Sequence, residues 1–501
     1  MEGTARRIPL LSKSRFMSGL QCHKRLYLEC FNRELADPVT EQQQQIFDSG
    51  TRVGELARDL FPGGVLISED HMDHAGAIDS TQRELTGAPV PPLYEAAFLH
   101  DSVRIRADVL VPHTDGSFDL VEVKSTTRLK EEHISDVGIQ LYVLLGHDLP
   151  VGRACLCHLN REYVYQGGDY DLRQLFTLED ITYECSVVQR EFPALLQDMR
   201  RSLAEREAPA IEVGRQCTNP HTCPFLGHCH ANVSEFPVGQ LPRASGKLLD
   251  ALKGAGIRDI RDIPAGFSGL NPLQRRVRDC VVMGQPYLNP ELPRQLRTLR
   301  RPLHFLDFET FNPPVPLYVG TRPYQQVPFQ WSLHTLTEDG SLRHAEFLHD
   351  GDGDPRTAFV DSLLANLGVR GPVLVYSGFE AARLRELAAA IPARAEELRA
   401  IAEERLVDLL QLVRSHYYHP AFHGSFSIKA VLPAIAPEMS YGDLAISDGT
   451  LASMAYAEMI GVGTTPQRKS EIRANLLAYC ERDTLAEVAI YRHFVGARTA
   501  S

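Results

Sequence analysis

Two acidic residues are separated by a single phenylalanine in the apolar segment 303–311, LHFLDFETF. Residues two positions apart on a β-strand point to the same face, so Asp307 and Glu309 would form a carboxylate pair beside a hydrophobic sheet. Burying two like charges together is costly unless a cation lies between them, and hard ions such as Mg²⁺ prefer oxygen ligands of this kind. We therefore predict a strand that carries a divalent-metal site. The alternative interpretation is an edge strand with two solvated acids.

A second group of charged residues lies on two predicted neighbouring strands. Alternation of apolar and polar residues predicts strands at 102–111 and 118–125, joined by a turn. Asp108 lies within the first strand, and Glu122 and Lys124 share one face of the second. The two acids can hold a divalent ion, and the lysine can orient the attacking water or stabilise negative charge developing at phosphorus. The alternative is an exposed Glu–Lys pair on an edge strand.

Three cysteines follow at equal intervals in the segment 216–229, QCTNPHTCPFLGHC. Cys217, Cys223 and Cys229 are each six positions apart. A tetrahedral metal ion or a cluster takes four ligands, and these three thiolates therefore leave one ligand missing. Zinc and iron–sulfur clusters both accept four thiolates. The spacing therefore predicts a metal site and leaves the metal open.

A tyrosine and an aspartate lie four positions apart near the C-terminus, in the segment 478–494, AYCERDTLAEVAIYRHF. The pattern predicts a helix on which Tyr479 and Asp483 share one face. Taken alone, the pair is a routine feature of a helix surface. Its position after the carboxylates of the earlier strand makes it a candidate for completing a two-metal site.

The composition is that of a globular protein without membrane spans. Of the 501 residues, 44% are hydrophobic and 23% are charged, and no apolar run reaches the ~18 residues of a spanning helix. The length predicts two or three domains. Because the first residues lack the apolar core of a secretory signal, we expect a cytoplasmic location with no membrane partner, where cysteines serve as thiols or metal ligands.

The charge is unevenly distributed along the chain. The net charge is −12, but the segment 240–303 carries twelve Lys or Arg residues against five Asp or Glu residues. This excess fits either solvated helix faces or a surface that binds a nucleic-acid backbone. Leucine-rich patterns around Gly254–Gly256 and in the segment 271–284 predict short helices, which we interpret as a small basic linker module at 236–300.

The first 235 residues resemble the PD-(D/E)XK nuclease core, in particular its RecB-like branch. The resemblance rests on Asp108, Glu122 and Lys124, and on Gln140 in the predicted helix that follows. It implies that the two acids bind a metal ion, that the lysine is electrophilic and that the glutamine supports the site. In that branch an earlier helix supplies a histidine or a glutamate as a further ligand, and Glu55, next to the matching position, is the candidate here.

Two positions depart from the RecB-like pattern. Gly54 stands where the branch has a histidine, and Leu144 stands where it has a tyrosine four residues after the glutamine. The cysteines match RecB-like nucleases with an iron–sulfur cluster, including CRISPR-associated ones, in which one cysteine comes from the N-terminal helix. The resemblance implies a 4Fe–4S cluster, with Zn²⁺ as the alternative, held by four ligands: Cys22, Cys217, Cys223 and Cys229.

Residues 301–501 resemble the DEDD exonucleases of the RNase H-like fold. The D-x-E motif matches Asp307 and Glu309, and Glu380 stands where the second motif has an aspartate. The Y-x-x-x-D motif of the tyrosine subclass matches Tyr479 and Asp483. The resemblance implies that the four acids hold two Mg²⁺ or Mn²⁺ ions and that the tyrosine orients water.

The expected architecture is therefore α/β, with three parts. They are a RecB-like PD-(D/E)XK domain at 1–235, the helical linker at 236–300 and an RNase H-like DEDD domain at 301–501. The combination resembles bacterial fusions of these two domains that are grouped under domains of unknown function. We expect a metal-dependent 3′–5′ exonuclease, acting on DNA rather than RNA, with a possible second nuclease site in the first domain. The alternative is a nucleic-acid-binding or redox-gated regulatory protein with a decayed N-terminal core.

Overall fold

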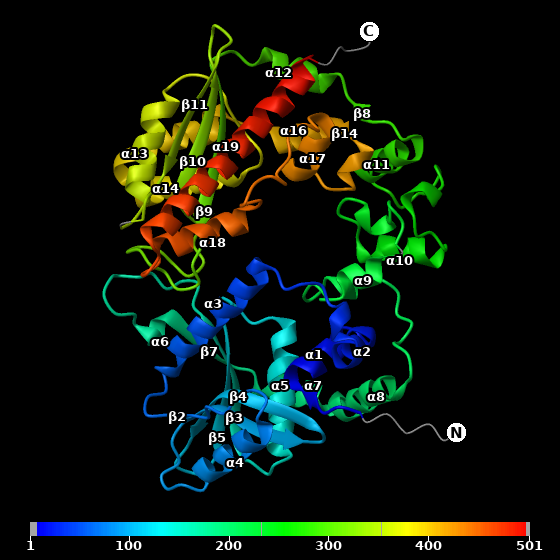
Figure 1. Ribbon diagram of the computed structural model, residues 1–501, viewed down its shortest axis with the longest axis vertical. Helices are drawn as coiled ribbons and strands as arrows, with labels where there is room; N and C mark the ends of the chain where they lie inside the picture. The colour runs from blue at the N-terminus through cyan, green and yellow to red at the C-terminus, as the bar shows by residue number, and fades with distance from the viewer. Residues whose placement is uncertain (1–7, 232, 352, 497–501) are drawn as a thin grey trace. The chain divides into compact units, whose positions relative to one another are not determined.

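The computed structural model describes residues 8–231, 233–351 and 353–496, and it has an α/β architecture (Figure 1). The chain divides into two compact units. Unit 1 comprises Met1–Asn232 and Pro313–Tyr324, and unit 2 comprises Val233–Asn312 and Gln325–Ser501. The segment 236–300, predicted as a separate linker module, thus falls within unit 2. No helix in the described ranges is both long and apolar enough to cross a membrane.

Unit 1 is built on a seven-stranded sheet in the order β2-β3-β4-β5-β6-β7, with β1 paired to β4. Strands β3, β4 and β5 form the predicted antiparallel meander, whereas β5 and β6 are parallel and are connected through helix α5. The strands are β1 (Leu11–Ser12), β2 (Val65–Leu66), β3 (Leu93–His100), β4 (Val103–Pro112), β5 (Phe118–Lys124), β6 (Val151–Leu159) and β7 (Phe176–Asp180).

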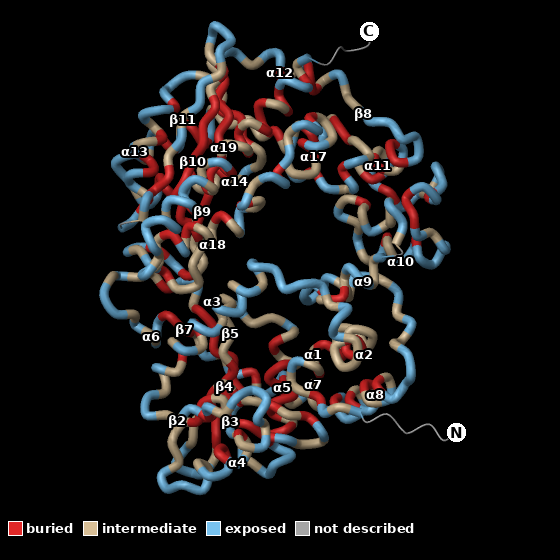
Figure 2. The backbone as a smooth tube through the Cα atoms, in the orientation of Figure 1, coloured by how far each residue is buried: buried red, intermediate tan, exposed pale blue. Residues whose placement is uncertain are grey.

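Helices cover both faces of this sheet. One face packs against apolar residues of α1, α5 and α8, and the other packs against Val53 and Ala57 of α3. The buried residues concentrate along the strands and these helix faces (Figure 2). The helices are α1 (Lys13–Gln21), α2 (His23–Phe31), α3 (Glu41–Arg58), α4 (His74–Leu85), α5 (Glu131–Leu145), α6 (Leu172–Leu175), α7 (Thr182–Val188), α8 (Phe192–Ala204) and α9 (Leu226–His230).

Two short helices follow β1 in place of one continuous N-terminal helix. Ser12 caps α1 by accepting a hydrogen bond from the N–H of Arg15, and α1 ends at Gln21. Cys22 then adopts an extended backbone with φ −167° and ψ 121°, and α2 begins at His23. The break therefore separates Cys22 from the regular helical surface.

Unit 2 contains a five-stranded sheet in the order β11-β10-β9-β12-β13. The segment 303–311 is the central strand, antiparallel to β10 and parallel to β12. Since it has a neighbour on both sides, the alternative of an edge strand with solvated acids is wrong. The strands are β9 (Leu303–Phe311), β10 (Val327–Leu336), β11 (Leu342–Leu348), β12 (Val373–Val375) and β13 (Leu406–Asp408).

Helix α19 crosses one face of this sheet, and α13 and α14 cover the opposite face (Figure 1). Residues 406–408 form β13, and Asp408 then caps α16 by accepting from the N–H of Gln411. These helices are α13 (Arg356–Leu367), α14 (Phe379–Ala390), α15 (Ala395–Ala400), α16 (Leu409–His416), α17 (Ile428–Ile435), α18 (Gly449–Ile460) and α19 (Pro466–Gly496).

The helical segment 236–300 shares its core with the rest of unit 2. Leu252, Val277 and Leu296 belong to the same buried cluster as Phe305 of β9 and Phe494 of α19. Strand β8 also pairs with β14 from a distant part of the unit. The additional elements are α10 (Gly246–Gly254), α11 (Pro272–Met283), β8 (Tyr287–Leu288), α12 (Glu291–Thr298) and β14 (Tyr417–Tyr418).

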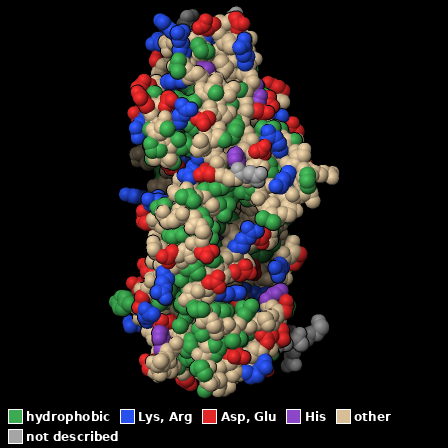
Figure 3. All heavy atoms as spheres, turned by 90° about the vertical axis from the view of Figure 1, so that its left-hand side faces the viewer, with side chains coloured by type: hydrophobic (Ala, Val, Ile, Leu, Met, Phe, Trp, Pro, Cys, Tyr) green, Lys and Arg blue, Asp and Glu red, His purple; other side chains and the backbone are tan. Residues whose placement is uncertain are grey.

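Several arginines of this basic segment make contacts within unit 2. Arg276 donates to the carbonyl of Arg414 at 3.0 Å and lies over the ring of Tyr287, and Arg297 donates to the carbonyl of Val495 at 2.8 Å. Part of the basic excess is therefore used in packing. Other arginines of the segment are exposed: Arg275, Arg294 and Arg300. On the molecular face drawn in Figure 3, basic and acidic side chains are interspersed.

Candidate metal and catalytic sites

Strand alternation directs the two acids of β9 toward α19. Phe305, two residues before Asp307, packs edge-on against Tyr491 of α19 with ring centroids 5.6 Å apart. The intervening Phe308 points the other way and packs against Phe359 of α13. Asp307 and Glu309 therefore lie on the α19 side of the sheet, as the period of two requires. Glu309 is buried and Asp307 is partly buried.

Helix α19 contributes three polar residues on successive turns of the same face. Tyr479 and Asp483 are buried as the four-residue spacing predicted, and Glu487 continues the series. Glu487 is 1% exposed, and neither of its carboxylate oxygens has a hydrogen-bond partner within the described ranges. Sequence analysis missed Glu487, although the spacing from Asp483 was a usable signal.

Glu380 enters the same cluster from α14. The residue lies in the first turn of this helix, just after β12, and is 3% exposed. Its Oε2 atom is buried without a partner among the described residues. Asp307 and Asp483 both interact electrostatically with carboxylates of this group, so the four predicted acids do meet at one end of the sheet.

Burial and mutual repulsion hold these carboxyl groups toward their protonated forms. Burial, followed by the charges of Asp483 and its neighbours, raises the pKa of Asp307 well above its ordinary value, and the pKa of Glu309 rises for the same reasons. Burial raises the pKa of Glu380 to about 8 and that of Asp483 to about 6. The pKa of Glu487 is also raised, first by burial and then by Asp307.

The donor set fits hard divalent ions. One ligand atom each from Asp307, Glu309 and Cys480 lies within 4.8 Å of the other two. Carboxylate oxygens are the preferred ligands of Mg²⁺ and Mn²⁺, and a cation here would relieve the repulsion between the acids and engage the unpaired oxygens of Glu380 and Glu487. Cys480 is buried as expected, and its thiol lies 3.5 Å from Oδ2 of Asp307.

A lysine and a second tyrosine complete this carboxylate cluster. Lys429 of α17 donates to the hydroxyl of Tyr479 at 3.3 Å, and its charge partly opposes the rise in the pKa values of Glu309 and Asp483 that burial causes. Tyr441 donates to Oδ1 of Asp483 at 2.5 Å. Sequence analysis identified neither Lys429 nor Tyr441, because both come from segments without a recognisable motif.

The predicted site of unit 1 also assembles. Lys124 donates to Oε1 of Glu122 at 2.7 Å, and Gln140 of α5 donates to Oε2 at 2.7 Å. Asp108 accepts a hydrogen bond from the N–H of Val123 at 2.8 Å. Burial and the charge of Glu122 raise the pKa of Asp108 to about 7. Antiparallel pairing of β4 with β5 thus brings the acid and the acid–lysine pair together.

Two further residues of unit 1 balance its charge. Lys13 at the start of α1 lies 2.6 Å from Oε1 of Glu122, and Asp136 of α5 lies 2.5 Å from Lys124. Burial alone would raise the pKa of Glu122. The ammonium groups of Lys124 and Lys13 outweigh burial and hold this pKa well below its usual range. Sequence analysis missed Lys13, which is 109 positions from Glu122.

Two candidate positions of the RecB-like pattern lie apart from this group. Glu55 is exposed on α3, and no described contact joins it to Asp108 or Glu122. Tyr142 directs its hydroxyl to Asp101 at 3.1 Å rather than to the acids. The third metal ligand expected on the earlier helix is therefore not in contact with the other two in this structure.

The four predicted cysteine ligands line one small cavity. Gln21, the last residue of α1, donates to the carbonyls of Gln216 and His221 and thereby joins the first helix to the cysteine loop. Burial raises the pKa values of two of these thiols, and the nearby thiols raise them further. The cavity is lined by Cys22, Cys217, Cys223 and Cys229.

Four thiols that line one cavity can hold either a 4Fe–4S cluster or a single zinc ion, because both accept four thiolate ligands. The donor set therefore fits both candidate cofactors.

Comparison with known proteins gives one partial match. A family described as a domain of unknown function, DUF2779, matches residues 304–427. This segment contains Asp307, Glu309 and Glu380 but ends before α19. No curated protein matches the chain.

Proposed function

We propose that unit 2 is a metal-dependent nuclease of the DEDD type, with an RNase H-like fold, that removes nucleotides from the 3′ end of DNA. The observation that carries this proposal is the cluster of buried acids from β9, α14 and α19, whose pKa values are raised first by burial and then by the charges of neighbouring acids. A structural role explains this poorly, because unpaired buried carboxylates destabilise a fold unless a cation binds.

The residues divide into metal ligands and groups that handle the water. The ligands of two Mg²⁺ or Mn²⁺ ions would be Asp307, Glu309, Glu380 and Asp483. Two such ions stabilise the attacking and leaving oxygens of an in-line displacement at phosphorus. The hydroxyl of Tyr479 accepts a hydrogen bond from Lys429, and this bond holds the hydroxyl beside Asp483. From that position the hydroxyl of Tyr479 would orient the attacking water.

The direct test is cleavage of labelled nucleic acid. Single- and double-stranded DNA and RNA, labelled at the 5′ end, would be incubated with the protein in Mn²⁺ or in a chelator. We expect a ladder of products shortened from the 3′ end of DNA in Mn²⁺ only, lost in Asp307→Asn and kept in Asp250→Asn, which alters an exposed acid of α10. All four substrates remaining intact across a broad pH range would overturn the proposal.

For unit 1 we propose a RecB-like PD-(D/E)XK core that holds nucleic acid and contributes little cleavage. Lys13 and Lys124 already neutralise Glu122, and Glu55 stands apart from the acids, which favours the alternative of a decayed nuclease core. A second active nuclease site would require Lys13 to leave Glu122. Cleavage that survives Asp307→Asn but disappears in Lys124→Ala would show that the roles of the two units are reversed.

We further propose that the cysteine cavity holds a 4Fe–4S cluster that joins α1 to the end of unit 1. The resemblance to RecB-like nucleases with an iron–sulfur cluster supports a cluster over zinc, and the four matching cysteines line one cavity. Iron and acid-labile sulfide should be present in equal amounts in anaerobically purified protein and absent from Cys22→Ser. Stoichiometric zinc without iron in protein purified under the same conditions would contradict this assignment.

A further inference from the structure

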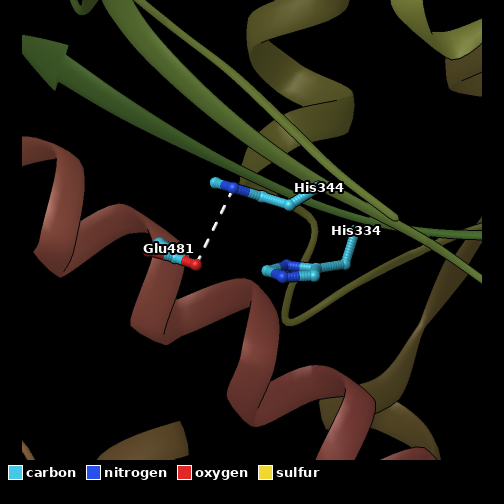
Figure 4. Close-up of side chains that lie close together, drawn as sticks. All are labelled: His334, His344 and Glu481. Carbon is cyan, nitrogen blue, oxygen red and sulfur yellow. Dashed lines mark ion pairs between the residues drawn. The ribbon is translucent and has the colours of Figure 1, made fainter. Parts of the chain in front are cut away.

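Two histidines and a glutamate form a separate group at the outer part of the sheet in unit 2. His334 lies on β10, His344 lies opposite it on β11, and Glu481 projects from α19 toward them (Figure 4). One possible ligand atom from each residue lies within 4.8 Å of the other two. None of these residues is part of the carboxylate cluster described above.

The hydrogen bonds around the group define which histidine nitrogens are free. Thr484 Oγ1 lies 3.1 Å from the carbonyl of Glu481 and 2.8 Å from Nδ1 of His334. Both hydrogen bonds form together only when the Thr484 hydroxyl donates to the carbonyl and Nδ1 of His334 carries the ring proton. In that tautomer Nε2 of His334 carries the lone pair. Burial lowers the pKa of His334 to about 4, which keeps the ring neutral at physiological pH.

The same reasoning applies to the second histidine. Ser332 lies 2.8 Å from Thr484 and can donate to it, so the Ser332 oxygen accepts from Nε2–H of His344 at 3.0 Å. This leaves the lone pair of His344 on Nδ1, the atom that lies 3.7 Å from Glu481. That distance is too long for a hydrogen bond, so the pair is not a simple histidine–glutamate contact.

We propose that His334, His344 and Glu481 form a zinc-binding site that joins β10 and β11 to α19. Two imidazole nitrogens and one carboxylate oxygen, with an open fourth position for water, are a typical zinc ligand set. The nitrogens that do not bind the metal are held by Thr484 and Ser332, which is the supporting arrangement that metal-binding histidines usually have.

To bind zinc, the ligand atoms of the three side chains need to move only slightly closer to one another. Zn–N bonds of about 2.0–2.1 Å place tetrahedral ligand atoms about 3.4 Å apart, against separations of up to 4.8 Å in this structure. His334 is buried and fixed, while the side chains of His344 and Glu481 are 24% and 44% exposed. These two exposed side chains can make the adjustment.

The test is zinc binding to the full chain, without reference to nuclease activity. Protein dialysed against a mild chelator would be equilibrated with Zn²⁺ and its zinc content measured by elemental analysis. We expect His344→Ala and Glu481→Gln each to bind one zinc ion fewer per chain than wild type, or to bind it at least about tenfold more weakly. Both changes are at partly exposed positions, so the fold should survive.

Two controls separate this site from other sources of zinc. His71 lies beside Asp70 in an exposed pair at 3.4 Å, and no third ligand joins them among the described residues, so His71→Ala should retain the wild-type zinc content. Zinc that enters the carboxylate cluster is separated by repeating the measurement in an Asp307→Asn background, where His344→Ala should still remove one zinc ion per chain. Unchanged zinc binding in both His344→Ala and Glu481→Gln, or no loss on adding His344→Ala to Asp307→Asn, would overturn the proposal.

Discussion

In unit 1 two lysine side chains contact the buried Glu122, whereas in unit 2 several buried acids face one another around Lys429. The residue types are similar, but the pKa of Glu122 is lowered and that of Glu309 is raised. The position of the ammonium groups decides between these outcomes. In unit 1 the charge of Glu122 is therefore balanced by lysines without a metal ion, whereas in unit 2 Lys429 offsets the charges of the acids only in part.

This contrast has a consequence for metal binding. An ion that enters unit 1 must displace Lys13 from Glu122 or share the carboxylate with it. An ion that enters unit 2 relieves repulsion among Asp307, Glu309 and Asp483. We therefore expect unit 2 to bind divalent ions more tightly and to carry out the hydrolysis.

The largest effect should come from paired substitutions of one acid in each unit. Asp307→Asn removes a proposed metal ligand from the cluster of buried acids, so 3′-end cleavage should fall by at least about 10²-fold. Asp108→Asn should change the same rate by less than about threefold, since we propose that unit 1 contributes little cleavage. The measurement is the initial rate on 5′-labelled single-stranded DNA in Mn²⁺. Equal losses in the two variants would remove the distinction between the units.

The charge balance of unit 1 can be tested by removing one lysine. In Lys13→Met the buried Glu122 keeps only Lys124, so the free energy of unfolding should fall by about 1–3 kcal/mol. Lys130→Met removes a more exposed partner of Glu132 and should cost less than about 1 kcal/mol. Urea unfolding of both variants measures the difference, and identical midpoints would indicate that Lys13 is not held by Glu122 in solution.

A smaller effect is expected at the tyrosine of the carboxylate cluster. Tyr479→Phe removes one hydroxyl that accepts from Lys429, so the cleavage rate should fall by about tenfold while Mn²⁺ affinity stays unchanged. Tyr183→Phe, at a position that is 76% exposed, is the matched control. An unchanged rate in Tyr479→Phe would show that this hydroxyl takes no part in orienting water.

The smallest effect concerns the pH dependence of stability in metal-free protein. Because the folded-state pKa of Glu380 is about 8, above its unfolded value, the protonated group favours folding at low pH and this contribution is lost as pH rises toward 8. The Glu380→Gln variant mimics the protonated form of the residue. Between pH 5 and 8 the melting temperature of this variant should therefore fall by about 2–4 °C less than the melting temperature of wild type. Saturating Mn²⁺ should abolish the difference. Parallel melting curves without metal would contradict the raised pKa.

Local periodicity explains which parts of the site were predictable. Alternation on a strand placed Asp307 and Glu309 on one face, and the helical repeat placed Tyr479 and Asp483 together. The antiparallel meander of unit 1 followed from alternating residues in the same way. The same helical repeat extends to Glu487, so this residue was within reach of sequence reasoning.

Long-range contacts explain what was missed. Lys13 reaches Glu122 across 109 positions, and Lys429 reaches Tyr479 across 50, with no motif at either lysine. The break at Cys22 was not foreseen either, because residues on both sides favour helix and no local signal marks the extended backbone at this position. The packing of residues 236–300 into unit 2 likewise depends on distant partners in the fold.

Direct Mn²⁺ binding tests the contrast between the two units most simply. Metal-free wild type, Asp307→Asn and Asp108→Asn would each be titrated with Mn²⁺, with free ion followed by electron paramagnetic resonance at pH 8. We predict that wild type and Asp108→Asn bind the same number of ions tightly and that Asp307→Asn loses this binding. Tight binding that survives in Asp307→Asn but disappears in Asp108→Asn would contradict the account.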